Sequence, residues 1–153
     1  MSDIKILRYK NQLDYLFAKV SSLGSDLEMQ SHWSRYLCVR VSGFLEIAVK
    51  TIYKNYAKEK ACPFVVNYVE NQLSYFQNPR MDKILNIAKS FNPEWAEKIR
   101  LATEGEIKDA IETIGINRNK IAHGENVGIT YVNIKKYYGN VLKLIELLEK
   151  QCK

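Results

Sequence analysis

The sequence predicts an all-α fold, and three observations lead to this prediction. Only 7 glycines and 3 prolines occur in 153 residues, and so few turn-forming residues favour long helices over many short strands. Apolar residues recur at helical spacing along most of the chain. No segment alternates apolar and polar residues convincingly at period two, so we expect no sheet. The length suits one domain, residues 1–153, with a hydrophobic core of its own.

Two long helices are expected in the first part of the chain. The first covers residues 3–23 and has one apolar face. The second covers residues 26–56 and opens with Ser25-Asp26-Leu27-Glu28, which has the spacing of a capping box. Between Tyr36 and Ile52 this helix is apolar on nearly every side, which is typical of a helix at the centre of a fold. Ser42-Gly43 lowers helix propensity there, so we expect a neighbouring helix to approach closely at that point.

Five further helices follow. We therefore expect a bundle of about six to seven helices. Pro63 and Asn92-Pro93-Glu94 mark two of the starts, because proline suits the first helical position. Gly124 ends the sixth helix, and Thr130 is an expected N-cap for the seventh. The expected ranges of the third to seventh helices are 63–77, 80–90, 93 onward, 104–123 and 130 onward.

Charge and cysteine content indicate the setting of the protein. The formal net charge of +6 hints at an anionic partner such as RNA, although many basic proteins bind no nucleic acid. Three cysteines, an odd number without metal-ligand spacing, point to a reduced, cytoplasmic location, with Cys38 as a buried small apolar residue. No apolar run approaches the roughly 18 residues of a membrane span. We therefore expect no membrane segment, no secretion signal, no metal and no cofactor.

The sixth predicted helix carries an arginine inside its apolar stripe. Ile107, Ile111, Ile114 and Ile121 form that stripe, and Arg118 falls between the last two. An unpaired buried charge is costly, so this guanidinium needs a carboxylate, an interface or a ligand phosphate.

Asn119 and His123 lie beside Arg118 on the same helix. They are four residues apart and share a face, and the helix dipole favours a protonated imidazole at the C-terminal end. An arginine can hold a phosphate bidentately, and a histidine can move a proton near neutral pH. This grouping suits phosphate chemistry, although a lone histidine at a helix end can equally be a simple cap.

The segment Arg118-Asn119-Lys120-Ile121-Ala122-His123 resembles the Arg-x4-6-His signature of HEPN domains. Further stretches resemble the HEPN branch associated with ribosomal-L-PSP domains (RiboL-PSP-HEPN), and the resemblance covers about residues 12–150. These stretches are Trp33 to Val39 with Ser42 to Glu46, Asn78-Pro79-Arg80 with Phe91, and Ile129-Thr130.

The resemblance implies a HEPN-like helical bundle that works as a homodimer, with the two Arg–His pairs brought together. It further implies a metal-independent endoribonuclease, a toxin or antiphage effector, that leaves 2′,3′-cyclic phosphate ends. Arg118 and His123 would be catalytic and Asn119 supporting, with an antitoxin or defence protein as a partner. The alternative is a catalytically inactive HEPN module that binds a nucleotide or a protein. Glu125 departs from the family, because some HEPN toxins carry a modified tyrosine at that position.

Three other residues are candidates for supporting roles. Glu46 either pairs with Lys50 one turn later or crosses to Arg118 and fixes its guanidinium. Arg40 is either a snorkelling side chain or a contact for substrate phosphate. Lys120, within the motif, is a further candidate RNA contact.

Tyrosines of the last helix allow two interpretations. Tyr131, Tyr137 and Tyr138 can stack on nucleobases, but aromatic residues of an amphipathic helix more often belong to the core.

Overall fold

The computed structural model describes residues 1 and 3–153, and its regular structure is entirely helical. No strand occurs among these residues, so the predicted all-α class is confirmed. No helix of this part of the chain is long and apolar enough to cross a membrane. The helices are α1 Ile4–Ser21, α2 Leu27–Lys60, α3 Pro63–Ser74, α4 Met81–Phe91, α5 Pro93–Thr103, α6 Glu106–Ala122 and α7 Tyr131–Gln151.

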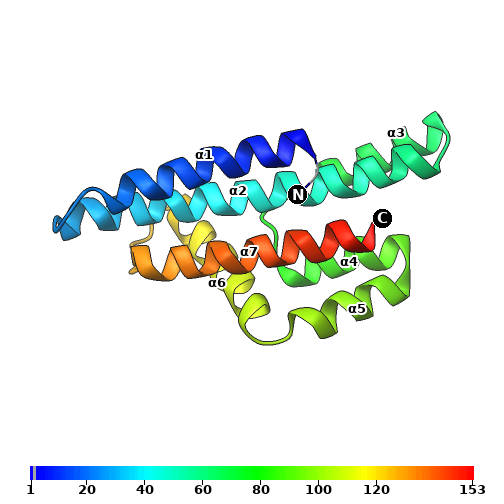
Figure 1. Cartoon of the computed structure of the whole chain (residues 1–153). Coiled ribbons are helices and arrows are strands. Elements are labelled where there is room, and N and C mark those ends of the chain that lie inside the picture. Colours follow the sequence, from blue (N-terminus) through cyan, green and yellow to red (C-terminus); the bar gives the residue numbers. More distant parts are fainter. Residues whose placement is uncertain (2) are drawn as a thin grey trace.

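Helix α2 is the centre of the bundle, as predicted. It packs against α1, α3, α6 and α7, while α4 and α5 form a pair of their own (Figure 1). The hairpin of α1 and α2 lies on one side of α7, and the α4–α5 pair lies on the other. Helix α6 crosses α7 and also touches α2, so its C-terminal end is held by two long helices.

Side-chain caps explain where several helices begin. Asp3 accepts hydrogen bonds from the amides of the first turn of α1, and Thr130 accepts one from Asn133 N (3.2 Å) at the start of α7. At α2 the predicted capping box is wrong, because Asp26 and not Ser25 caps the helix, accepting a bond from Met29 N (3.0 Å). Helix α2 also continues about one turn beyond the predicted end, to Lys60.

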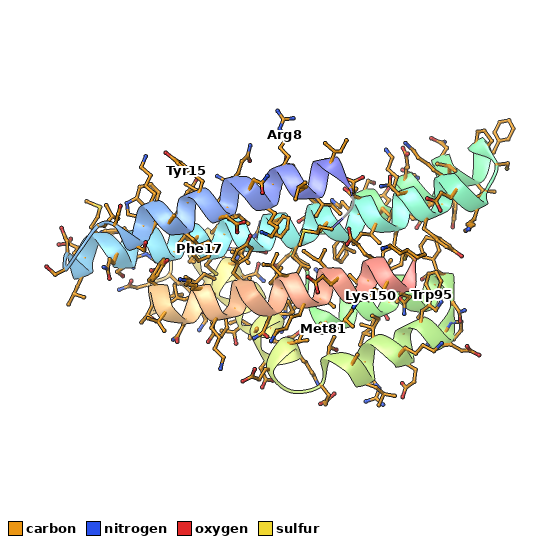
Figure 2. All side chains as sticks on the ribbon, viewed as in Figure 1. Arg8, Tyr15, Phe17, Met81, Trp95 and Lys150 are labelled. Atoms are coloured by element: carbon orange, nitrogen blue, oxygen red, sulfur yellow. The ribbon has the colours of Figure 1, made fainter. Side chains whose placement is uncertain are left out.

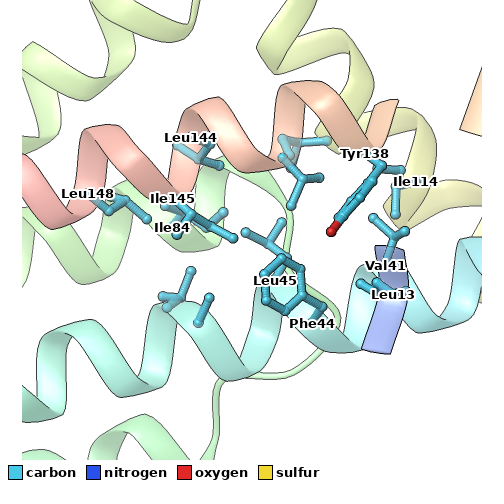
Figure 3. Close-up of a cluster of buried hydrophobic side chains, with 14 of the residues drawn as sticks. Leu13, Val41, Phe44, Leu45, Ile84, Ile114, Tyr138, Leu144, Ile145 and Leu148 are labelled. Carbon is cyan, nitrogen blue, oxygen red and sulfur yellow. The ribbon is translucent and has the colours of Figure 1, made fainter. Parts of the chain in front are cut away.

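The core joins side chains from α1, α2, α4, α6 and α7 (Figure 3). Phe17 lies between α1 and α7, whereas Arg8 and Tyr15 point away from the bundle (Figure 2). The ring of Phe17 stacks on Tyr138, with 4.8 Å between ring centroids. The Tyr138 hydroxyl donates to Asp14 Oδ1 (2.8 Å), and burial raises the pKa of this tyrosine. Tyr138 is therefore a core residue and not a surface for stacking bases.

The glycine in α2 does not have the role predicted for it. Ser42 is buried, but Gly43 is exposed, and a Cβ built on Gly43 would meet no atom within 4 Å. The expected close approach of a helix at Gly43 is therefore wrong. A close approach of another kind occurs at Gly115 of α6, where a side chain, that of Arg80, crosses the helix.

Candidate functional site

The C-terminal end of α6 presents His123 to solvent. His123 is the C-cap residue, and Gly124 follows with φ of 75°, a conformation that favours glycine. Gly124 N donates to Ile121 O (3.0 Å) and Glu125 N donates to Lys120 O (2.9 Å), which together make a Schellman motif. This motif satisfies the last carbonyls with backbone groups, so the imidazole is not needed as a cap. It is exposed and makes no side-chain hydrogen bond with any described residue.

Arg118 lies one turn before this end, inside the apolar stripe where the sequence places it. Ile111 and Ile114 of that stripe are buried, and Arg118 itself is half-buried. Its guanidinium donates to Asn119 Oδ1 (3.3 Å) and forms no ion pair within the described part of the chain. From the sequence, this guanidinium has three possible partners, and the described residues do not supply the first, a carboxylate. The remaining possible partners are an interface and a bound phosphate.

Contacts with α2 fix the position of this helix end. The Cys38 thiol donates to the carbonyl of Ile114 (3.7 Å), and Arg35 Nη1 donates to Asn126 Oδ1 (3.2 Å) just beyond α6. Burial raises the pKa of Cys38 to about 12, so the thiol stays protonated at neutral pH and acts as a packing group. The N-terminal part of α2 therefore supports α6 from Ile114 to its end.

Glu46 does not support Arg118 in the way predicted. Its carboxylate accepts a bond from Lys50 Nζ (2.8 Å) and another from the backbone N–H of Asn78 (3.3 Å). Of the two partners considered for Glu46, Lys50 is therefore confirmed and the predicted pair with Arg118 is wrong. Glu46 instead ties α2 to the segment that leads into α4.

A second carboxylate, which the sequence reasoning missed, does hold an arginine beside α6. Glu112 accepts from Arg80 Nε (2.7 Å) and Arg80 Nη2 through one oxygen, and from Met81 N (2.9 Å) through the other. The Arg80 side chain crosses α6 at Gly115, where a Cβ would lie 2.2 Å from Arg80 Cδ. Because Arg80 donates to it, the pKa of Glu112 lies below its ordinary value. No local pattern in the sequence signals this contact, because Arg80 comes from 35 residues before Gly115.

A surface hollow adjoins Asn119 between α6 and the start of α4. It has a volume of about 580 Å³ and is lined by Asn78, residues 80–83, Leu85 and the α6 face that carries Lys108, Glu112 and Asn119. Asn119 therefore touches both Arg118 and this hollow. No group of three His, Cys, Asp or Glu side chains among the described residues is placed to hold a metal ion.

Arg40 and Lys120 have different positions relative to the motif. Arg40 donates to the Tyr36 hydroxyl (2.8 Å) and lines a groove between α1 and α2, and no described contact joins it to Arg118 or His123. Lys120 is exposed on α6, within the motif itself. The structure thus brings Arg118 and Asn119 together with His123 one turn away, and it leaves Glu46 and Arg40 on other contacts.

One comparison with known proteins identifies the family. The family model described as RiboL-PSP-HEPN matches residues 4–153, which is nearly the whole chain and includes the Arg118–His123 segment. No curated protein and no solved structure matches the chain significantly. The all-helical bundle agrees with the family match, and the extent of that match covers every helix described above. The chain therefore belongs to the RiboL-PSP-HEPN family.

Proposed function

We propose that the protein is a metal-independent RNA endonuclease, acting as a toxin or antiphage effector in the cytoplasm. The observation that carries this proposal is the half-buried Arg118, whose guanidinium has no carboxylate partner among the described residues. A phosphate held bidentately would supply the missing negative charge. Family membership and the net charge of +6 support an RNA substrate.

The reaction uses the RNA itself as the nucleophile. The 2′-oxygen forms a bond to the adjacent phosphorus while the bond from phosphorus to the 5′-oxygen breaks, leaving a 2′,3′-cyclic phosphate and a 5′-hydroxyl. His123 takes the proton from the 2′-hydroxyl or gives one to the leaving 5′-oxygen. Arg118 stabilises the charge on the phosphorane, and Asn119 orients Arg118 or the phosphate.

A homodimer would complete this site. One imidazole cannot serve as base and acid in the same step, whereas a two-fold axis near the end of α6 brings a second His123 and a second Arg118 to the same phosphate. An antitoxin or another defence protein would then act by covering this surface or separating the two copies.

The first test is cleavage by the purified protein and two variants. The wild type should cleave single-stranded RNA, leave DNA of the same sequence intact because DNA lacks the 2′-hydroxyl, and remain active in excess EDTA. His123→Ala should lose about 10²–10⁴-fold in rate, the range for removal of a proton-transfer group. Arg118→Ala should lose activity to a similar degree. Gel analysis with end-group mapping measures both the rate and the cyclic phosphate.

Two results would contradict the proposal. Undiminished cleavage by His123→Ala would rule out the mechanism. RNA left intact by a clean wild-type preparation would favour the second candidate function, a catalytically inactive module that binds a nucleotide or protein. One observation favours that alternative: no described residue holds the His123 ring in a fixed orientation, as a dedicated general base would require.

A further inference from the structure

We propose that the hollow between α6 and the start of α4 is a nucleobase subsite, which holds the base next to the phosphate at Arg118. This inference rests on the proposed function and adds to it a place and a chemistry for substrate selection. Four observations carry it: the position of Asn119, the fixed guanidinium of Arg80, the amide of Asn78, and the lysines on the rim.

Asn119 connects the hollow to the motif. Its side chain accepts from Arg118 (3.3 Å) and also lines the hollow. One helical turn, roughly 5.4 Å along the axis, separates Asn119 from His123 on the same side of α6. An RNA strand with its phosphate at Arg118 and His123 would therefore place a neighbouring nucleotide over the hollow.

Arg80 forms a flat and immobile wall of the hollow. Glu112 neutralises its charge and fixes it through Nε (2.7 Å) and Nη2, and Gly115 beneath it leaves the space that its side chain occupies. A guanidinium already paired with a carboxylate is a poor phosphate clamp, but its planar face can stack on a base. Leu85, half-buried in the same hollow, adds apolar surface that suits a base better than a phosphate.

Asn78 supplies hydrogen-bonding capacity that the protein does not use. Its Oδ1 is buried and has no hydrogen-bond partner among the described residues, and buried polar atoms of this kind are rare. Its backbone has φ of 48° and is held by Glu46, which accepts from Asn78 N. The edge of a base, which carries both donors and acceptors, can pair with the amide of Asn119, and with that of Asn78 once its buried Oδ1 turns toward the hollow.

Two lysines on the rim of the hollow can meet the sugar–phosphate backbone, beside the exposed carboxylate of Asp82. Lys83 and Lys108 are exposed on opposite walls, on α4 and α6. Lys83 donates to the carbonyl of Gln77 (2.8 Å), and Lys108 pairs with Glu104 (3.4 Å) and contributes to lowering the pKa of Glu112. Neither contact removes the lysine from solvent, so both can steer phosphates without selecting a base.

The experiment measures binding and cleavage separately. Binding of short homopolymeric RNAs is followed by fluorescence anisotropy with the His123→Ala protein, which keeps the RNA intact. Asn78→Gly removes the amide and tolerates the positive φ, so the backbone should be unaffected. We expect this variant to weaken binding of the preferred homopolymer by about three- to tenfold, as for one or two hydrogen bonds, and to bind the four homopolymers more equally.

A matched pair of double variants tests the rim. Lys83→Ala with Lys108→Ala should weaken binding of all four homopolymers and lower the salt dependence of affinity. Lys89→Ala with Lys98→Ala removes the same charge from exposed positions that do not line the hollow, and should have a smaller effect.

In otherwise wild-type protein, Asn78→Gly should raise KM more than it lowers kcat.

The outcomes distinguish this inference from the proposed function. If the wild type cleaves RNA but Asn78→Gly keeps its base preference and its KM, the hollow is not a base subsite and the function stands. If the two lysine pairs behave alike, the strand does not run over this rim, which contradicts the placement of the base in the hollow. If the wild type neither cleaves nor binds RNA, the proposed function fails and this inference fails with it.

Discussion

Arg118 shows how one residue can reveal a site through what it does not contact. The sequence places it inside an apolar stripe, and the structure leaves it half-buried without a carboxylate among the described residues. Arg80 is a useful contrast on the neighbouring surface, because it is also half-buried but bonds to Glu112. The charge of Arg80 is balanced by a carboxylate of its own chain, whereas the described partner of Arg118 is the neutral amide of Asn119.

This difference predicts opposite effects on stability. Arg118→Ala should leave the free energy of unfolding within about 0.5 kcal/mol of the wild type or raise it, because it removes a desolvated and unpaired charge. Arg80→Ala should lower it by about 1–3 kcal/mol, since Glu112 and Met81 lose an organised contact. Urea denaturation followed by circular dichroism measures both. A loss for Arg118→Ala as large as that for Arg80→Ala would show that Arg118 is structural.

The sequence predicts those residues of the site whose contacts lie within one helix, and it does not predict contacts between distant segments. Arg118, Asn119 and His123 lie on one helix, so helical geometry alone places them together. The partner of Glu46 could not be predicted in this way, because two readings, Lys50 and Arg118, were both chemically sound. Only the arrangement of α2 against the segment before α4 decides between them.

Among the elements, α6 and the start of α4 depend on each other through Arg80, Glu112 and Gly115. Every predicted helix is present, because apolar periodicity, prolines and caps act locally. The choice between Gly43 and Gly115 as the point of close approach is not local. A helical glycine is needed only where a neighbour crosses it, and the crossing group here, Arg80, comes from 35 residues earlier in the chain.

Gly115→Ala should therefore destabilise the protein although alanine is the better helix former. Alanine gains about 1 kcal/mol of helix propensity, but its Cβ would lie 2.2 Å from Arg80 Cδ and displace the side chain from Glu112. We expect a net loss of about 1 kcal/mol in the free energy of unfolding, because charge-assisted bonds contribute more than the propensity gain.

The control is the same substitution in a protein that lacks Arg80, where the effect on the free energy of unfolding should have the opposite sign. In an Arg80→Ala background the obstacle is gone, and Gly115→Ala should then stabilise the protein. A stabilising effect of Gly115→Ala in both backgrounds would show that the crossing of Arg80 over α6 does not constrain position 115.

The same contact predicts a pH dependence. The pKa of Glu112 is lowered in the folded protein from its ordinary value of 4.5, chiefly by the hydrogen bonds from Arg80. A lowered carboxyl pKa stabilises the fold above the ordinary value, and this contribution is lost as the pH falls through the folded pKa. The stability difference between wild type and Glu112→Gln should therefore be largest near neutral pH and shrink below about pH 4.5. Urea denaturation across this range measures it, and a constant difference would contradict the assignment.

At the scale of the whole molecule, we expect the protein to be a homodimer in solution. Arg118 needs an interface or a phosphate, and Ile116 on the same helix is 42% exposed although it is apolar. A two-fold axis near the end of α6 would bring the two motifs together and cover Ile116, which lies seven residues before His123 and so on the same side of the helix. Light scattering coupled to gel filtration should give twice the monomer mass at micromolar concentration for the wild type and for His123→Ala. A monomer for both would count against the shared site.

The segment that enters α4 has a further consequence for how the fold tolerates change. Glu46 of α2 accepts a hydrogen bond from Asn78 N, and Glu112 of α6 accepts one from Met81 N. Carboxylates from two different helices therefore bind backbone amides that are three residues apart. Surface connections usually accept insertions at small cost. Here a residue added between Asn78 and Met81 would lengthen the span between the two amides by up to about 3.5 Å, so we expect it to break one of the two bonds. In its length, this connection is as constrained as the helices that it joins.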